Sequence, residues 1–330
     1  MSGDITTSNG QRIGLSVPLE GVPLGTHGEL MAEWKSLGYT DLWSSEGNET
    51  DAFTPLVVAA CSAPGLHLGT AIVPVFSRGP AVLAQSAASL AELAPGRFTL
   101  GLGSSSHLIA ELWNAATFEQ PYERMRSTLL FLHDAFEGKS IDGDYGAFRV
   151  GMYKLGLLPA EPPRILIAAL REKMLRLSGT DADGAILTWV TASDVSRMAP
   201  FVRESGDDKQ IVTRIWVAPT EDTEAAHWIG RRLTAVFLNS PALRASQEWL
   251  GRGPMLSEAW RRWDEGNFKA SAAAIPVELL DELVVSGTPQ DVHRRVDEYR
   301  ANGVDVPVMA LIPVRDVDLI DAARQYAPIS

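Results

Sequence analysis

The chain has 330 residues, 45% of them hydrophobic and 21% charged, and this balance excludes an intrinsically disordered or collagen-like protein. Its 41 acidic and 29 basic residues give a net charge of −12, which disfavours nucleic acid and anionic membrane surfaces as partners. The single cysteine, Cys61, excludes an internal disulfide, and the lack of a signal-like N-terminus or an apolar run of about 20 residues predicts a cytoplasmic protein without a membrane partner.

Short apolar runs alternate with segments of helical periodicity, and glycine or proline separates them. In chain order we expect a strand at 12–17, a helix at 30–38, a strand at 40–43, a helix at 53–61, a strand at 66–73, a helix at 82–93, strands at 97–103 and 165–168, a helix at 172–178, a strand at 184–189, a helix beginning at 194, a strand at 211–217, helices at 221–238 and 290–301, and a strand at 308–312. This alternation is typical of parallel βαβ units, and eight such strands close a (β/α)8 or TIM barrel. Because no linker-like stretch divides the chain, we expect one barrel domain over residues 1–330.

Two segments fall outside this alternation. Residues 140–163 are expected to form a loop with a hairpin around 142–144. Residues 241–275 carry aromatic side chains at helical spacing, which predicts a helical insertion between strands seven and eight. Such an insertion builds an active-site wall or a dimer face in many barrels, or it simply packs against the barrel.

Several enzyme signatures are missing from the sequence. None of the six histidines has a second metal-ligating residue at zinc-site spacing, so no metal site is expected. Residues 138–140 resemble the end of a P-loop, but His133 occupies the position of the required first glycine. Residues 101–106 nearly match the dinucleotide fingerprint, but Ser106 replaces its third glycine and the segment follows the fourth strand rather than the first.

The ends of the fourth and fifth strands carry small residues suited to an anion. Backbone N–H groups and hydroxyls at 103–106 can surround a phosphate, or they are ordinary helix caps. At 168–171 two alanines allow a ligand close to the backbone beside a basic side chain, or they serve only close packing of helix on strand. The candidate anion-binding residues at these two ends are Gly103, Ser104, Ser105, Ser106, Ala168, Ala169, Leu170 and Arg171.

Strands two and three end in two further features on the same face. Ser45 and Glu46 begin a polar loop after strand two, where the active sites of barrels lie. Strand three is interrupted by Pro74 and followed by Gly79 and Pro80, which predicts a bulge at its end.

Taken together, these segments resemble the bacterial luciferase-like superfamily and, within it, the oxidoreductases that use the deazaflavin coenzyme F420. The resemblance covers the chain from residue 13 to residue 313. It is carried by residues 68–85, 94–103, 113–114, 118, 121–126, 168–171, 174–175, 183–185, 249–253, 274–276 and 286–289.

The resemblance implies a barrel that is often a homodimer and that holds a deazaflavin at its C-terminal mouth. By position, the cofactor phosphate would contact Ser104, Ser105 and the backbone of residues 168–170. A cis peptide bond without proline would lie behind the cofactor ring. It is expected between Ala71 and Ile72, with the bond between Ile72 and Val73 as the alternative.

At two of these strand ends the chain departs from the family's sugar-phosphate dehydrogenase branch. That branch has an Asp-His pair after strand two and a Glu after strand four, whereas this chain has Ser45, Glu46 and Ser106. Glu46 is the candidate catalytic residue, because a partly desolvated carboxyl group can carry the proton that accompanies hydride transfer. Alternatively, Glu46 only hydrogen-bonds the ring or a loop amide, or it faces water.

We therefore expect an enzyme that transfers hydride between coenzyme F420 and an unidentified small organic substrate. One alternative is an FMN-dependent monooxygenase or reductase on the same barrel, because an anion site at these strand ends would serve either cofactor phosphate. Another is a flavin-binding protein without turnover. The absorbance of a bound cofactor distinguishes the first two, and hydride transfer to any acceptor excludes the third.

Overall fold

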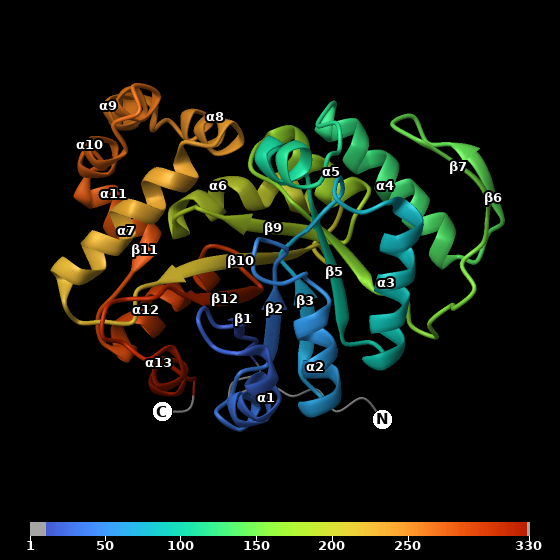
Figure 1. The fold of residues 1–330 in the computed structure, drawn as a ribbon, viewed down its shortest axis with the longest axis horizontal. Helices are drawn as coiled ribbons and strands as arrows, with labels where there is room; N and C mark the ends of the chain where they lie inside the picture. Colours follow the sequence, from blue (N-terminus) through green and yellow to red (C-terminus); the bar gives the residue numbers. More distant parts are fainter. Residues whose placement is uncertain (1–10, 329–330) are drawn as a thin grey trace.

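Eight parallel strands form a closed barrel in the structure, a computed structural model that describes residues 11–328 (Figure 1). The barrel closes because β10 pairs with both β9 and β12, and β12 pairs with β1. The predicted TIM barrel is therefore confirmed. In order around the barrel the strands are β1 (Gly14–Val17), β2 (Asp41–Ser44), β3 (His67–Thr70), β5 (Phe98–Gly103), β8 (Arg164–Ala168), β9 (Gly184–Thr188), β10 (Gln210–Val217) and β12 (Val306–Leu311).

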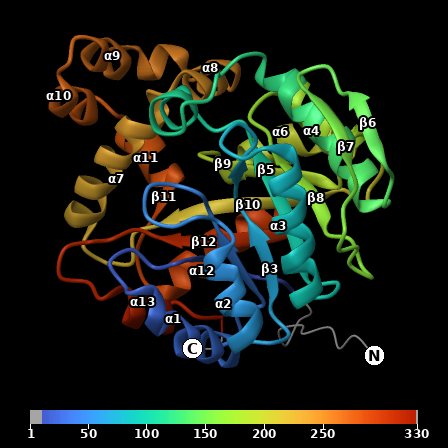
Figure 2. The same cartoon turned by 45° about the vertical axis from the view of Figure 1, so that its right-hand side comes forward.

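Helices surround the barrel on its outer side, as Figures 1 and 2 show. Two of them begin with reciprocal capping boxes, Thr191 with Asp194 and Thr288 with Asp291, which satisfy backbone amides that the helix leaves free. The surrounding helices are η1 (Leu24–Thr26), α1 (His27–Ser36), α2 (Thr54–Ser62), α3 (Pro80–Leu93), η2 (Leu108–Trp113), α4 (Pro121–Phe136), α5 (Glu172–Thr180), α6 (Ala192–Arg203), α7 (Thr223–Leu238), α12 (Pro289–Ala301) and α13 (Leu319–Gln325). No helix among the described residues is long and apolar enough to cross a membrane.

Two predictions concern the ends of the chain, which lie outside the residues that the structure describes. The single domain predicted over residues 1–330 includes residues 1–10 and 329–330, and the expected lack of a signal segment rests on residues 1–10. These residues lie outside the described part of the chain.

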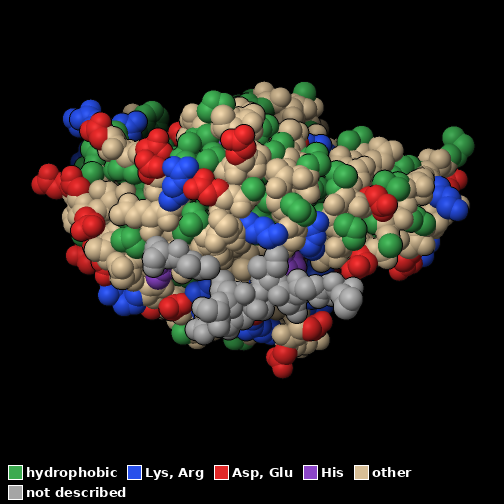
Figure 3. Space-filling model, turned by 90° about the horizontal axis from the view of Figure 1, so that it is seen from below, with side chains coloured by type: hydrophobic (Ala, Val, Ile, Leu, Met, Phe, Trp, Pro, Cys, Tyr) green, Lys and Arg blue, Asp and Glu red, His purple; other side chains and the backbone are tan. Residues whose placement is uncertain are grey.

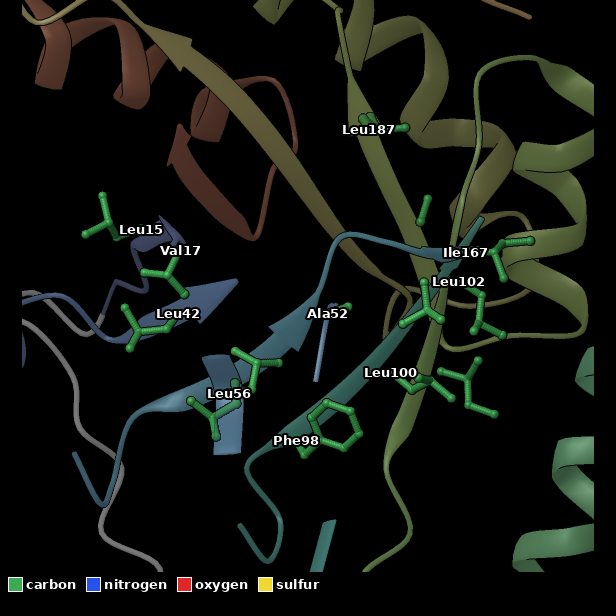
Figure 4. Close-up of a cluster of buried hydrophobic side chains, with 14 of the residues drawn as sticks. Leu15, Val17, Leu42, Ala52, Leu56, Phe98, Leu100, Leu102, Ile167 and Leu187 are labelled. Atoms are coloured by element: carbon green, nitrogen blue, oxygen red, sulfur yellow. The ribbon is translucent and has the colours of Figure 1, made fainter. Parts of the chain in front are cut away.

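The main hydrophobic core lies between the strands and the helices. Every second strand residue points outwards, and Leu15, Leu42 and Leu100 are completely buried there. Figure 4 shows these side chains together with Leu56, which α2 contributes to the same core. Burying each such leucine stabilises the fold by about 1.5–3 kcal/mol.

The other strand residues point into the barrel, where the ring of Trp43 on β2 occupies the centre. The side chains buried with it are Leu166, Ile186, Val212, Val306 and Val308. The ring fits because two neighbouring strands have glycine beside it: a Cβ on Gly69 would lie 2.3 Å from the ring, and one on Gly14 would lie 3.0 Å from it. Trp43 therefore closes the barrel below its C-terminal mouth.

Strand three is shorter than predicted because its end is interrupted. The expected strand at 66–73 divides into β3 and the short β4 (Val73–Pro74), which pairs with β5. The peptide bond between them, Ala71–Ile72, is cis, as predicted, and a second cis bond precedes Pro18.

The predicted hairpin exists, but its turn lies further along the chain. Residues 142–144 belong to β6 (Ile141–Asp144), which pairs antiparallel with β7 (Arg149–Tyr153). The turn forms after them because the Asp144 carboxylate accepts from the amide of Gly146, whose φ of 98° suits glycine. The prediction that placed the turn at 142–144 was therefore wrong.

The segment between β10 and β12 is helical, as predicted. Its elements beyond α7 are α8 (Pro241–Trp249), α9 (Gly253–Asp264), α10 (Phe268–Ala273), α11 (Val277–Leu283) and the short β11 (Val284–Val285). Two side chains of α8 fix it to the barrel: the Ser246 hydroxyl donates to the Leu170 carbonyl at 3.0 Å, and the Gln247 amide donates to the Trp189 carbonyl at 3.1 Å. The insertion thus rests on the ends of β8 and β9, on the opposite side of the molecule from the β6–β7 hairpin (Figures 1 and 2).

Acidic and basic side chains are interspersed on the face that Figure 3 shows. Ion pairs also link separate elements: the Arg324 guanidinium on α13 donates to both carboxylate oxygens of Glu33 on α1, at 2.7 and 3.0 Å. These contacts lower the pKa of Glu33. The pair is exposed, so it contributes at most about 1 kcal/mol to stability.

Candidate functional site at the mouth of the barrel

The mouth of the barrel is defined by inward-facing residues at the C-terminal ends of the strands. Below them the layer around Trp43 is buried. Above that layer the inward-facing residues are partly exposed, so a ligand can reach them. They are Ser16, Ser45, Ala71, Ile72, Ala168, Thr188 and Arg214.

The two predicted anion-binding ends lie side by side, because β5 and β8 are neighbours with Leu102 opposite Ile167. Ser104, Ser105 and Ser106 are partly exposed there, and Ser105 has a φ of 60°. Within residues 11–328 the backbone amides of Ser104 and Ser105 have no acceptor. They are therefore available to an anion.

The β8 side of this site offers fewer amides than the sequence predicts. The Ala169 amide donates to the Ile186 carbonyl at 3.1 Å, so it is already used. The Leu170 amide, by contrast, has no acceptor among the described residues. Arg171 is exposed beside it, and the Lys173 ammonium lies 3.6 Å from the centre of the Tyr122 ring.

The interrupted end of strand three forms the adjoining wall of the mouth. The Ala71 amide donates to the Ser44 carbonyl at 2.6 Å, and the Glu46 amide donates to the Ile72 carbonyl at 3.1 Å. The Ile72 side chain packs against Gly103. A Cβ added to Gly103 would lie 2.6 Å from the Ile72 side chain. Gly103 thus gives Ile72 its place in the wall.

Glu46 lies on the same side, but its carboxylate is not free. It accepts from the Ser77 hydroxyl at 3.0 Å and from the Arg78 guanidinium at 2.8 Å. Arg78 in turn lies 3.5 Å from Asp51 and covers the Phe53 ring at 5.0 Å. Glu46 therefore ties the loop after β2 to the loop before α3, a partnership that the sequence analysis did not anticipate.

A second carboxyl group near the mouth was also missed. Glu20 is exposed on the loop after β1, and partial burial together with the nearby Glu49 raises the pKa of Glu20. The two glutamates are 29 positions apart in the chain, so only the fold brings them together. Among residues 11–328 no group of three or more His, Cys, Asp or Glu side chains is placed to hold a metal ion.

The side of the mouth formed by β9 and β10 carries an arginine and three aromatic rings. The Arg214 guanidinium lies 4.3 Å from the centre of the Trp216 ring. Trp216 stacks on Trp189 at 4.9 Å, and Phe237 of α7 lies 5.0 Å from Trp189. None of these was selected from the sequence, although an arginine in the middle of the apolar run 211–217 was a visible signal.

The chain matches one protein family model, and it is similar to several relatives and solved structures. A family model described as luciferase-like monooxygenase matches residues 3–306. A putative coenzyme F420-dependent oxidoreductase of Mycobacterium tuberculosis is 26% identical, over 91% of this chain and 95% of its own length. Among solved structures, the coenzyme F420-dependent tetrahydromethanopterin reductase of Methanopyrus kandleri superposes with a TM-score of 0.76 at 16% identity, covering 96% of this chain and 97% of the reductase. An F420-dependent secondary alcohol dehydrogenase, solved with an F420–acetone adduct, gives 0.77 at 14% identity and covers 97% and 98% of the two chains.

Proposed function

We propose, from the fact that the chain belongs to the luciferase-like monooxygenase family, that it is an oxidoreductase transferring hydride between coenzyme F420 and a small organic substrate. The observation that carries the proposal is the row of unused amides at two neighbouring strand ends, next to the wall formed by residues 71–73. A flavin-like ring with a phosphate tail needs these two features side by side.

The residues present fit the phosphate of such a cofactor. Ser104, Ser105 and Leu170 would donate backbone N–H groups, since these amides have no acceptor among residues 11–328. The two serine hydroxyls add donors, and Arg171 and Lys173 add positive charge nearby. Ala168 would allow close approach, whereas the amide of Ala169 would stay in the sheet.

The residues beside the phosphate site fit the ring. Ala71 and Ile72 are partly exposed towards the mouth and would lie behind it, with Val73 fixing the segment to β5. Gly103 leaves room above Ile72, and Ser45 and Ser106 would border the ring on either side. When bound, the deazaflavin gives or accepts two electrons as a hydride.

Glu46 is the proposed proton carrier. A catalytic carboxylate works best when other groups hold its orientation, and Ser77 and Arg78 hold this one. Its backbone amide is bound to Ile72, which keeps the residue beside the wall of the mouth.

The test is a fluorescence titration of the purified chain with F420 and, separately, with FMN. We expect saturable binding of F420 and much weaker binding of FMN. A screen of small carbonyl compounds with reduced F420 then measures turnover. Tighter binding of FMN would support the FMN-dependent alternative, and F420 binding without turnover on any acceptor would support a binding protein.

The resemblance to this family also leads us to propose a homodimer. Light scattering of the purified chain should give the mass of two chains. The mass of one chain, at concentrations used for activity, would contradict this.

A further inference from the structure

The Arg214 side chain is a cation in the barrel that lacks an anionic partner. It projects from the centre of β10 into the mouth, with Thr188 of β9 opposite it in the sheet. Its Nε is buried without a hydrogen-bond partner, and within residues 11–328 the guanidinium forms no ion pair. Buried charges in proteins are normally paired, so an unpaired one indicates a ligand that supplies the counter-charge.

Two neighbouring polar atoms are unpartnered in the same way. The Thr188 hydroxyl and the Trp216 indole N–H are both buried and have no hydrogen-bond partner in the described structure. Trp216 is two residues beyond Arg214 on the same face of β10. Three potential donors thus lie together on one side of the mouth, and no carboxylate among the described residues accepts from them.

The position of Arg214 separates it from the proposed cofactor site. In the closed barrel β10 and β3 are four strands apart in either direction, through β12, β1 and β2 or through β9, β8 and β5. Arg214 therefore faces the wall at residues 71–73 from across the mouth. A molecule that reacts with a ring on that wall would present its other end to Arg214.

Apolar surface adjoins this charged group. Trp189, Trp216 and Phe237 pack with ring centres 4.9–5.5 Å apart; the two indoles are buried, and Phe237 is the exposed ring of the three. An exposed aromatic ring next to this cluster, together with an unpaired guanidinium, suits a substrate with an apolar body and a carboxylate end. Burial without a partner also lowers the pKa of Arg214 to about 10, and a bound anion would offset this cost.

We propose that Arg214, with Thr188 and Trp216, forms a subsite for a substrate carboxylate, so that the substrates of this protein are small carboxylic acids with an apolar body. The proposal rests on the proposed function only where it states that the bound carboxylate is a substrate and that its other end reacts at the wall formed by residues 71–73. The subsite itself is a property of the chain and binds carboxylates with or without the cofactor.

The experiment measures binding of four carboxylates, each against its uncharged amide: acetate, hexanoate, phenylacetate and benzoate. Calorimetric titration uses the full chain, with and without F420. At least one carboxylate should bind roughly ten- to hundredfold more tightly than its amide. Arg214→Met should abolish this preference, and Arg214→Lys should keep part of it. Arg294→Met, which removes an exposed arginine on α12, is the matched control and should leave it unchanged.

Thermal melting separates this role from a structural one. Because the Arg214 Nε is buried without an acceptor and the guanidinium has no anionic partner, replacing Arg214 by methionine should leave the melting temperature unchanged or raise it. If no carboxylate binds more tightly than its amide, or if Arg214→Met keeps the preference, the proposal is overturned. A fall in the melting temperature together with an unchanged preference would show that Arg214 only supports Trp216. Titration of the parent chain with F420 tests the proposed function independently of the subsite, and Arg214→Met should bind F420 as tightly as the parent chain.

Discussion

The Glu46 carboxylate lies 2.8 Å from the Arg78 guanidinium and so joins two loops that border the mouth of the barrel. The pair is mostly buried, with 15% of the Glu46 side chain and 20% of the Arg78 side chain exposed. Both roles considered for Glu46, moving a proton and holding a loop, remain compatible with this contact, and substitutions can distinguish them.

Glu46→Gln keeps the shape of the side chain and removes its ability to titrate. As a proton carrier, Glu46 should be essential to turnover, and its loss should lower kcat by about 10²–10⁴-fold with cofactor affinity nearly intact. Glu49→Gln, the control, removes an exposed carboxylate from the same loop and should stay within a few-fold of the parent. If Glu46→Gln also stays within a few-fold at matched cofactor occupancy, Glu46 only holds the loops together.

Ser104→Asp should weaken binding of the cofactor. The new carboxylate would lie beside the amides that are proposed to hold the phosphate. Two negative charges in the poorly screened mouth repel each other by an energy on the order of several kcal/mol. The change in affinity is measured by F420 fluorescence. Ser89→Asp places the same charge on the exposed side of α3 and serves as the control. Equal affinity of the two variants for F420 would show that the phosphate does not bind beside Ser104.

Gly69→Ala should destabilise the barrel because its Cβ would lie 2.3 Å from the Trp43 ring. Overpacking of this kind costs about 1–3 kcal/mol, and Trp43 is too enclosed to move freely. Denaturant unfolding measures the loss. At Gly79 an added Cβ meets nothing within 4 Å, so Gly79→Ala should change stability little. The double variant with Trp43→Phe should recover part of the loss, and strictly additive effects would contradict the proposed contact.

Acidification should destabilise the loop after β1 through His27. This histidine is buried, its Nε2 accepts from the Leu19 amide at 3.0 Å, and burial lowers its pKa. The folded chain therefore favours the neutral ring. The unfolded chain takes up a proton as the pH falls below 6.5, so stability is lost from that pH downwards.

The melting temperature of the parent should consequently fall more steeply between about pH 7 and 5 than that of His27→Gln. His133→Gln, at an exposed position on α4, is the control and should keep the slope of the parent. An unchanged slope in His27→Gln would show that other groups govern the acid response. Only the slopes are compared, since His27→Gln also loses hydrogen bonds at every pH.

The barrel could be predicted from the sequence because its signals are local. Short apolar runs that alternate with segments of helical periodicity predicted all eight strands to within a few residues of their bounds. The turn of the β6–β7 hairpin was misplaced because Asp144 and Gly146 decide it, and side-chain capping of this kind competes with the simpler Asp-Gly signal.

The candidate site was less predictable because its partners are distant in the chain. Strand ends at 103–106 and 168–171 could be selected by their small residues. That the Ala169 amide donates to the Ile186 carbonyl, or that Arg78 binds Glu46, depends on contacts between neighbouring strands and loops that are distant in the chain. Arg214 was not selected because the role of a charged residue within a buried strand depends on its spatial neighbours, which the sequence does not show.

Trp43 divides the barrel interior into two compartments that can change independently. Below it, Arg12 pairs with the buried Asp41 and holds the opposite end of the barrel. Above it, the inward-facing residues are partly exposed towards the mouth. New substrate preferences could therefore evolve, or be engineered, by randomising Ser16, Thr188 and Arg214 while the lower compartment keeps the fold intact. Combinatorial libraries at these three positions should contain mostly folded proteins, whereas libraries at Gly14, Trp43 and Gly69 should contain few.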